Sequence, residues 1–242
     1  MRRMSTPRLL FTWPLGIALA VLGLGMSGRR DCRAAEPEKA ADKSADTATD
    51  KAQWKSLFDG RSLKGWKETD FPGHSKVEVK GGTIVMLQGS QMTGITWTGE
   101  FPTMDYEIVT DAQRVDGSDF FYGLTFRYGD SPCSLILGGW GGGVIGLSSI
   151  DGQDASENET TQYMEFKTGR WYRVRLRVTK AKIEAWIDDK KLIDVDTKDR
   201  KFSIRPEVAL SRPLGFSCYA TTAALRDIKL RKLTPAELKS GK

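Results

Sequence analysis

The strongest signal along the chain is an alternation of apolar and polar residues with a period of two. Runs of this kind occur at residues 106–113, 172–178, 182–187, 191–195 and 225–233, separated by clusters of Gly, Asp, Asn and Ser. Alternation places the apolar side chains on one face of an extended strand. Because no helical segments alternate with these runs, the pattern predicts about 13 strands in two packed antiparallel sheets.

Turn residues join some of these runs into hairpins. Residues 77–87 read VEVKGGTIVML, with Gly81-Gly82 at the turn between two groups of strand-forming residues. Residues 182–195 form a second candidate hairpin, which turns at residues 188–190. Short turns rich in Gly and Asp between apolar runs are the strongest local signal for an antiparallel pair.

One short helix is expected, at the end of the chain. Thr234 is a suitable N-cap, Pro235 stands in the first turn, and Glu237 follows the cap by three residues, which together make a capping box. We therefore expect one β-rich domain over residues 54–233 and a short helical tail over residues 234–242. A domain of about 180 residues buries enough surface for a single core.

The first 35 residues have a different character. Arg2, Arg3 and Arg8 precede an uncharged run at residues 9–28, and Cys-Arg-Ala-Ala follows at residues 32–35. This arrangement predicts a secretory signal peptide over residues 1–35. The run has 20 residues, which is also long enough to cross a bilayer as an uncleaved anchor. Both interpretations export the domain to the periplasm, the medium or the cell surface.

Residues 36–53 predict a disordered linker, because they are rich in Ala, Asp and Lys and contain no aromatic residue. The charge distribution argues against nucleic acid as a partner of this domain. The chain has a net charge of +6, of which +5 lies in residues 1–35. The basic balance therefore belongs to the targeting segment, and we expect no nucleic-acid partner. A membrane contact is expected only if that segment stays uncleaved.

The order of motifs carries more information than any single motif. LFDGRSLKGWK at residues 57–67 is followed by DYEIVTDAQ, by a Gly-containing strand that ends in Phe126-Arg127, by GRWYRVRLRV and finally by TTAALRDIKLRKL. Over nearly all of residues 54–233 this order resembles the 3-keto-disaccharide hydrolase domain family. The resemblance implies an all-β fold, the concanavalin A-like jelly-roll sandwich of two antiparallel sheets. Lectins, laminin G modules and β-glucanases share that shape, and one of their sheets usually holds carbohydrate.

The resemblance also implies an activity, the hydrolysis of glycosidic bonds in 3-keto-disaccharides and related glycosides. A ketone at sugar C3 acidifies the hydrogen at C2, so such a site needs a base, an acid for the leaving oxygen and a cation or donor at the ketone. Where many family members have Asn-Ser-Gly, this chain reads Phe121-Tyr122-Gly123. The alternatives are a non-catalytic carbohydrate-binding module of the lectin type and a laminin G-like interaction domain, which fold alone does not separate.

A polar loop at residues 148–162, directly after GGWGGG, holds the densest group of candidate residues. The glycines let a sugar ring approach Trp140, and the loop supplies carboxylates and amides for its hydroxyl groups. A merely solvated loop is the alternative. The all-oxygen set can also bind Ca²⁺ or another divalent metal through Asp151 and Asp154. The catalytic candidates are Asp119, Asp151 and Glu157, and the substrate-binding candidates are Trp97, Arg127, Trp140 and Asn158.

Five other residues attract attention. Asp105 and Glu107 lie two apart on one strand face, about 7 Å from each other, a spacing that resembles glycosidase carboxylate pairs. Because polar residues continue that face, we expect it to meet water. His74 is the single histidine and lies in a loop. Cys133 and Cys218 have apolar neighbours and are expected to be buried thiols, although export also permits a disulfide.

Overall fold

The computed structural model describes residues 53–240. The predicted signal peptide and the predicted linker up to residue 52 lie outside the described residues. Within residues 53–240, none of the helices combines the length and apolar character that a membrane crossing requires.

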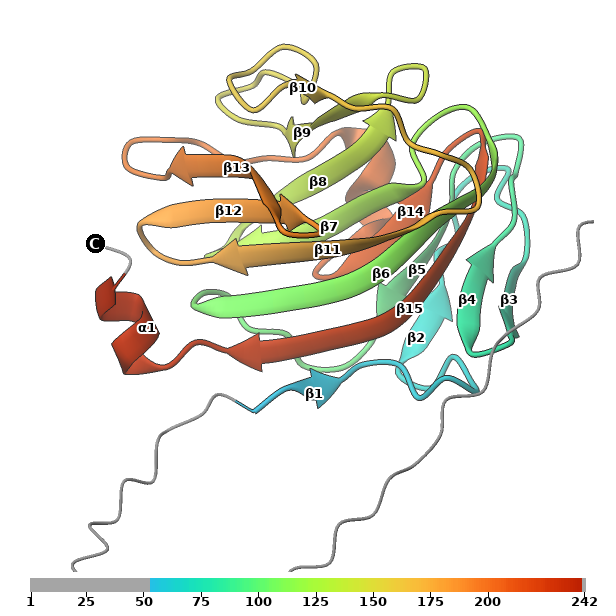
Figure 1. Cartoon of the computed structure of the whole chain (residues 1–242), viewed down its shortest axis with the longest axis horizontal. Coiled ribbons are helices and arrows are strands. Elements are labelled where there is room, and N and C mark those ends of the chain that lie inside the picture. Colours follow the sequence, from blue (N-terminus) through green and yellow to red (C-terminus); the bar gives the residue numbers. More distant parts are fainter. Residues whose placement is uncertain (1–52, 241–242) are drawn as a thin grey trace, which may run out of the picture. The chain divides into compact units, whose positions relative to one another are not determined.

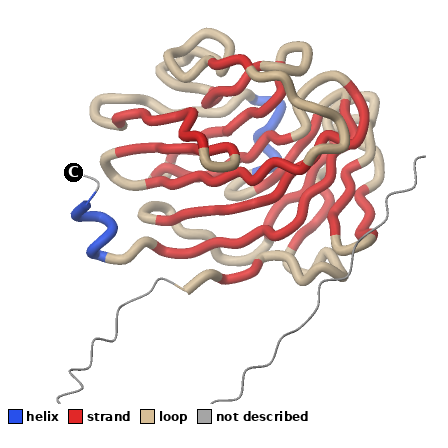
Figure 2. The backbone as a smooth tube through the Cα atoms, in the orientation of Figure 1, coloured by secondary structure: helices blue, strands red, loops and turns tan. Residues whose placement is uncertain are grey.

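Two antiparallel sheets pack against each other (Figures 1 and 2). The first sheet has eight strands. They are β1 (Lys55–Ser56), β3 (Val77–Lys80), β4 (Thr83–Met86), β6 (Tyr106–Gly117), β11 (Trp171–Val178), β12 (Lys182–Ile187), β13 (Lys190–Asp196) and β15 (Thr221–Lys232). Their order is β13-β12-β11-β6-β15-β4-β3, with β1 paired to β15.

The second sheet has seven strands in the order β10-β9-β8-β7-β14-β5-β2. They are β2 (Trp66–Glu68), β5 (Thr93–Trp97), β7 (Tyr122–Tyr128), β8 (Ser131–Gly139), β9 (Val144–Ser148), β10 (Gln162–Tyr163) and β14 (Gly215–Cys218). A 3-10 helix η1 (Pro206–Ser211) and the tail helix α1 (Pro235–Ser240) complete the described chain. The predicted all-β sandwich is therefore confirmed.

Alternation along each strand builds the core between the sheets. In β11 the buried residues are Tyr172, Val174, Leu176 and Val178, and the residues between them point outward. Strands β7 and β8 supply the opposite side through Leu124, Phe126 and Leu135. The period-two pattern of strands such as β11 thus produces the two-layer fold, because these strands bury one face against the opposite sheet.

The stretch LFDGRSLKGWK closes one end of this core. Leu57, Phe58 and Trp66 are buried, and Trp66 Nε1 donates a hydrogen bond to the carbonyl of Leu57 at 2.7 Å. The Trp66 ring lies edge-on to Trp97 at 5.1 Å and tilted to Phe216 at 5.6 Å between centroids. These aromatic contacts join the beginning of the domain to β5 and β14.

The local turn and cap predictions are confirmed. Strands β3 and β4 pair across Gly81-Gly82, and both glycines have positive φ angles. Strands β12 and β13 form the second hairpin. At α1, the Glu237 amide donates to Thr234 Oγ1 at 3.3 Å and the Thr234 amide donates to Glu237 Oε2 at 2.9 Å. These reciprocal bonds are the predicted capping box.

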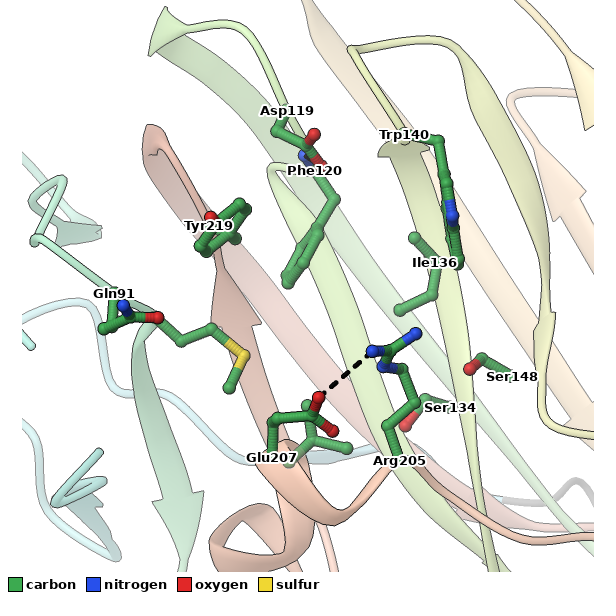
Figure 3. Close-up of a pocket in the computed structure, with 12 residues that line it drawn as sticks. Gln91, Asp119, Phe120, Ser134, Ile136, Trp140, Ser148, Arg205, Glu207 and Tyr219 are labelled. Atoms are coloured by element: carbon green, nitrogen blue, oxygen red, sulfur yellow. Dashed lines mark hydrogen bonds and ion pairs between the residues drawn. The ribbon is translucent and has the colours of Figure 1, made fainter. Parts of the chain in front are cut away.

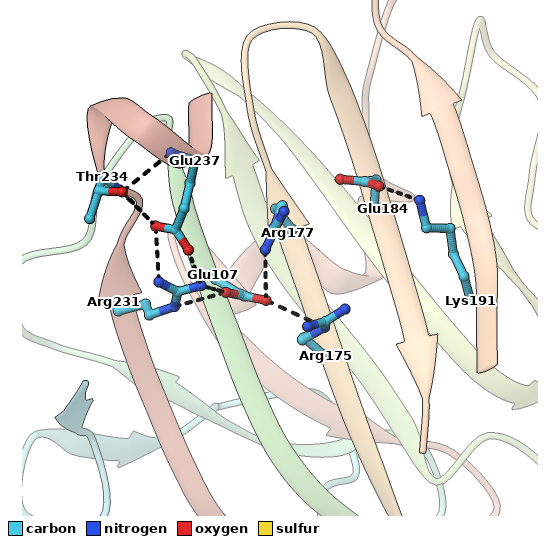
Figure 4. A network of polar contacts seen from close by, with 8 residues as sticks. All are labelled: Glu107, Arg175, Arg177, Glu184, Lys191, Arg231, Thr234 and Glu237. Carbon is cyan, nitrogen blue, oxygen red and sulfur yellow. Dashed lines mark hydrogen bonds and ion pairs between the residues drawn. The ribbon is translucent and has the colours of Figure 1, made fainter. Parts of the chain in front are cut away.

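The outer face of the first sheet is a charged network (Figure 4). Glu107 does not face water as expected, because its side chain is only 1% exposed. Arg231 Nε donates to its carboxylate at 2.8 Å, and Arg175 Nε and Arg177 Nη2 lie at 3.4 and 3.7 Å. Arg175 also stacks on Trp186 at 3.8 Å from the ring centroid. The guanidinium groups thus cover Glu107 and remove it from the catalytic candidates.

Both described cysteines are buried free thiols. Cys133 lies in β8 and Cys218 in β14, with their side chains in the core between the sheets. Burial raises the pKa of each thiol to about 12. This environment makes them inert packing groups at neutral pH.

Candidate functional site

A pocket of about 390 Å³ lies over the outer face of the second sheet (Figure 3). Its volume is inside the range of small-molecule sites, roughly 300–1,000 Å³. Residues from β8, β9 and η1 and from the connections around them line it: Gln91, Met92, Asp119, Phe120, Ser134, Ile136, Trp140, Ser148, Arg205, Glu207, Val208 and Tyr219. The core-facing side of the same strands is apolar, so the sheet separates the pocket from the core.

The sheet beneath the pocket carries small side chains. Ser134 in β8 bonds Thr125 in β7 at 3.1 Å between their hydroxyl oxygens, and Ser148 follows in β9. Gly123 leaves no room for a larger residue, since a Cβ there would lie 2.8 Å from Ser217 Oγ. Because these outward-pointing residues are small, they leave space above the sheet for a ligand.

Trp140 forms one side of the pocket from the turn between β8 and β9. It has a φ of 49° and its side chain stands out from the turn, with the residue 45% exposed. Gly141 and Gly142 follow with φ angles of 86° and 111°, which residues with a Cβ adopt only with strain. The glycine-rich sequence therefore shapes a turn that presents the indole.

A buried arginine holds this turn in place. Arg114 Nη2 donates to the carbonyls of Gly138 at 3.3 Å, Gly142 at 2.9 Å and Asp119 at 3.0 Å. The carboxylate of Asp119 accepts from the amides of Gly141 at 2.9 Å and Phe120 at 2.7 Å. Arg114 and Asp119 together connect the Trp140 turn to the chain entering β7.

Phe120 and Tyr219 form the opposite, aromatic side, and Met92 and Val208 add apolar side chains to the lining. The two rings stack at 6.1 Å between centroids with an interplanar angle of 25°. The amide of Tyr219 donates to the carbonyl of Phe120 at 3.0 Å, which fixes the two residues relative to each other. In Figure 3 the rings of Phe120 and Tyr219 lie across the pocket from Trp140.

An ion-pair cluster lies at the end of the pocket farther from Asp119 (Figure 3). Arg205 Nη2 donates to Glu207 Oε1 at 3.0 Å, and its Nη1 donates to Asp154 Oδ2 at 2.6 Å. Asp154 also accepts hydrogen bonds from the hydroxyls of Ser148 and Ser149. The hydrogen bond from Arg205 lowers the pKa of Glu207, and the same pairs raise the pKa of Arg205. Glu207 is therefore an ionised carboxylate and Arg205 a cation near neutral pH.

Two of the residues singled out from the sequence line this pocket, Asp119 and Trp140. Asp154 does not line the pocket itself but accepts hydrogen bonds from two residues that do, Arg205 and Ser148. Trp97 is buried and packs in the aromatic cluster with Trp66. Arg127 pairs with Asp130 at 3.3 Å at the far end of β7. Trp97 and Arg127 are outside the pocket lining.

The polar loop packs along the edge of β9. Asn158 is buried, and its Nδ2 donates to the carbonyl of Leu147 at 2.7 Å. Asp151 pairs with Arg200 at 2.7 Å, and Arg200 also binds Glu159. Glu157 is exposed. The loop therefore uses Asn158 and Asp151 for its own structure, and neither of them nor Glu157 lines the pocket.

The donor set does not fit the divalent-metal site expected at Asp151 and Asp154. Each of these carboxylates is already neutralised by a different guanidinium, Arg200 for one and Arg205 for the other. Across residues 53–240, no three His, Cys, Asp or Glu side chains are grouped as metal ligands. His74 lies in an exposed loop near Asp70 at 3.5 Å.

Sequence reasoning missed Arg205 and Glu207. They flank Pro206 in SIRPEVAL, a segment without strand alternation, and Arg205 reaches Asp154 across 51 positions of the chain. An arginine and a glutamate on either side of a proline are a signal only in retrospect, because solvent-exposed pairs of this kind are common.

The described fold is similar to several solved structures. A provisionally assigned glycosyl hydrolase from Parabacteroides distasonis has 15% identity and a TM-score of 0.50, with 75% of this chain and 94% of that chain covered. Domain 4 of AbnA, an extracellular arabinanase from Geobacillus stearothermophilus solved with arabinotriose, has 13% identity and a TM-score of 0.50, covering 78% and 98%. The Crh5 transglycosylase in complex with NAG has 12% identity and a TM-score of 0.51, covering 77% and 86%. At these identities the similarity establishes the shared sandwich fold.

A sequence search of curated proteins finds no match to this chain. A family model does match, and it spans residues 53–231, which include all but the last residue of the two sheets and every residue that lines the pocket. The chain therefore belongs to the family described as the 3-keto-alpha-glucoside-1,2-lyase-like domain.

Proposed function

We propose that the pocket binds a 3-keto-glycoside and eliminates the substituent at C1. Family membership supports the carbohydrate class and the reaction type. The observation that carries the proposal is the Arg205–Glu207 pair, which places a cation beside an ionised carboxylate at one end of the pocket that Trp140 flanks.

The chemistry requires a base, an acid for the leaving oxygen and an electrophilic partner at the ketone, and one carboxyl group can serve first as the base and then as the acid. A base removes the proton at C2, and the electron pair moves onto the C3 oxygen as an enolate. The enolate then returns its electrons, a C1–C2 double bond forms, and the C1–oxygen bond breaks. The departing oxygen takes up the proton that the base removed from C2 and leaves as an alcohol, which returns the base to its ionised form. Addition of water across the double bond then gives the 3-keto-sugar, so the net result is hydrolysis.

Glu207 and Arg205 suit the two roles as a pair. Glu207 is ionised and can therefore act as the base, and the hydrogen bond from Arg205 that lowers its pKa is lost as Arg205 turns to the developing enolate, which restores its basicity. Protonation removes the negative charge that Arg205 faces at the moment when negative charge develops on the ketone oxygen. Arg205 thereby exchanges one anionic partner for another, and the enolate is stabilised without a net change of charge in the pocket.

Trp140 and the small hydroxyl side chains would bind the sugar. An indole face stacks on the apolar face of a sugar ring, while Ser134 and Ser148 offer hydroxyl groups from the sheet below. Asp119, whose carboxylate accepts two backbone amides, holds the Trp140 turn rather than transferring protons.

The test is turnover of a 3-keto-glucoside in D₂O, with deuterium incorporation at C2 and alcohol release followed separately. Glu207→Gln should lower the rate by roughly 10² to 10⁴-fold. Glu157→Gln is the matched control, because Glu157 is exposed and outside the pocket lining, and it should leave turnover unchanged. Full activity in Glu207→Gln would refute the role of the pair. Binding of wild type to the keto-glucoside without deuterium exchange or release would instead indicate a carbohydrate-binding module.

We also propose that the domain works outside the cytoplasm, because residues 1–35 have the pattern of a secretory signal. N-terminal sequencing of protein from the native host should give a start near Ala35 or Glu36. A membrane-bound protein that retains residues 1–35 would indicate the uncleaved anchor, and a soluble cytosolic protein starting at Met1 would overturn the proposal.

A further inference from the structure

The pocket has two chemically different halves (Figure 3). One half carries the ion pair Arg205–Glu207 together with the hydroxyls of Ser134 and Ser148 and the indole of Trp140. The other half carries the rings of Phe120 and Tyr219, with Gln91 at its rim and the Asp119 carboxylate beside Phe120, and Met92 and Val208 complete the apolar part of the lining.

The apolar half is a preformed surface of aromatic rings that does not belong to the main core. Phe120 packs with Ile136, Val144 and Ala155 in a small cluster on the outer face of the second sheet. Tyr219 stacks on Phe120 and remains 41% exposed. The backbone bond between these two residues, and the bond from the Phe120 amide to Asp119, hold the backbones that carry the two stacked rings in place. A fixed, exposed ring pair beside a charged site is suited to a planar apolar group.

The reaction determines which part of a substrate meets each half. The ketone at C3 and the hydrogen at C2 must lie at Arg205 and Glu207, which places the keto-sugar in the polar half. The group attached at C1 then extends toward Phe120 and Tyr219, since Figure 3 shows these rings across the pocket from Trp140. A second sugar there would meet three polar groups, Gln91, the Tyr219 hydroxyl and the Asp119 carboxylate, and its remaining hydroxyl groups would face apolar side chains.

Resting on the function proposed above, we propose that this pocket selects 3-keto-glucosides whose leaving group is an aromatic alcohol over 3-keto-disaccharides. Phe120, Tyr219 and Met92 are the specificity-determining residues. An aromatic ring that is buried against these residues gains apolar contact that a sugar does not gain. A difference of this kind in an apolar pocket changes kcat/KM by on the order of 10-fold or more.

The experiment compares two substrates that lose the same type of leaving group. The 3-keto forms of 2-phenylethyl α-glucoside and of isomaltose both release a primary alcohol, so their intrinsic reactivities match. Wild type should favour the phenylethyl substrate in kcat/KM by about 10-fold or more. Tyr219→Ala should reduce this preference severalfold, Tyr219→Phe should retain it, and Trp140→Ala should lower kcat/KM for both substrates alike. Equal rates on both substrates in wild type, or an unchanged preference in Tyr219→Ala, would overturn the inference.

A binding measurement separates this inference from the elimination chemistry. Unoxidised 2-phenylethyl α-glucoside and isomaltose cannot react by the proposed route, and calorimetry of wild type with each reports recognition alone. Preferential binding of the phenylethyl glucoside in wild type, lost in Tyr219→Ala, supports the inference. Absence of turnover of the keto-glucosides would reject only the elimination chemistry. Equal affinity for the two glucosides, or failure to bind either, rejects the inference even when turnover is observed.

Discussion

Replacing Asn158 by alanine should destabilise the domain without acting on a ligand. Its Nδ2 donates to the carbonyls of Leu147 at 2.7 Å, Gln153 at 3.1 Å and Asp154 at 2.8 Å. Its Oδ1 accepts from the amide of Thr160 at 3.0 Å and from the Thr160 hydroxyl at 2.5 Å. One side chain therefore connects the polar loop to β9.

The magnitude follows from which of these bonds are buried. The bonds to Leu147 and to both donors of Thr160 are buried, whereas water can replace the two others in the mutant. Three buried bonds at about 1 kcal/mol each give a loss of about 3 kcal/mol in the free energy of unfolding. For a domain of this size that corresponds to a decrease in Tm of roughly 6 to 12 °C.

Urea unfolding followed by tryptophan fluorescence measures this loss, and a thermal scan checks the Tm. Glu157→Ala is the matched control, since it changes the exposed neighbour and should alter stability by less than about 0.5 kcal/mol. Wild-type stability in Asn158→Ala together with lost binding of a glucoside would refute the reasoning. That result would return Asn158 to the ligand-binding role suggested by the sequence.

Three further predictions concern the core and the charged face. Glu107→Ala should cost about 3 kcal/mol in urea unfolding, because Arg231 loses a buried partner, and a loss below about 1 kcal/mol would contradict that account. Glu237 has its pKa lowered from 4.5 to about 2, chiefly by the hydrogen bond from Arg231, so its stabilisation is present above pH 4.5 and is lost as the pH falls toward 2. Glu237→Gln should therefore be less stable than wild type at pH 7 and equally stable at pH 2, whereas a constant difference across this range in urea titrations would reject the linkage. Burial raises the pKa of Cys133 and Cys218 to about 12, so a thiol reagent at pH 8 should label neither in the folded protein and both in urea, and rapid labelling of the folded protein would contradict their burial.

The parts of the fold that the sequence predicted depend on local rules. The hairpin turn at Gly81-Gly82 needs positive φ angles, and the capping box at Thr234 needs only a partner three residues away. Strand alternation likewise requires nothing beyond neighbouring residues. Local determinants of this kind are visible in the chain because the interacting groups are close in sequence.

The site was less predictable because its contacts are distant in sequence. The polar loop was correctly seen as rich in carboxylates, yet Asp151 reaches Arg200 across 49 positions. Glu107 meets Arg231 across 124 positions. Composition indicates that a charge is present but does not say which other charge will neutralise it. Trp140 could be found because its flanking glycines are themselves a local signal.

The groups that give the pocket its chemistry are carried by connections rather than by the paired strands. Trp140 stands on the turn between β8 and β9, Tyr219 stands between β14 and β15, and Arg205 and Glu207 belong to the segment around η1. These connections can change in evolution or in the laboratory while the sheets keep their register and their core. A library that varies only the segment around η1 therefore changes the Arg205–Glu207 pair on an unaltered scaffold, and one that varies the β14–β15 connection changes the aromatic side of the pocket independently.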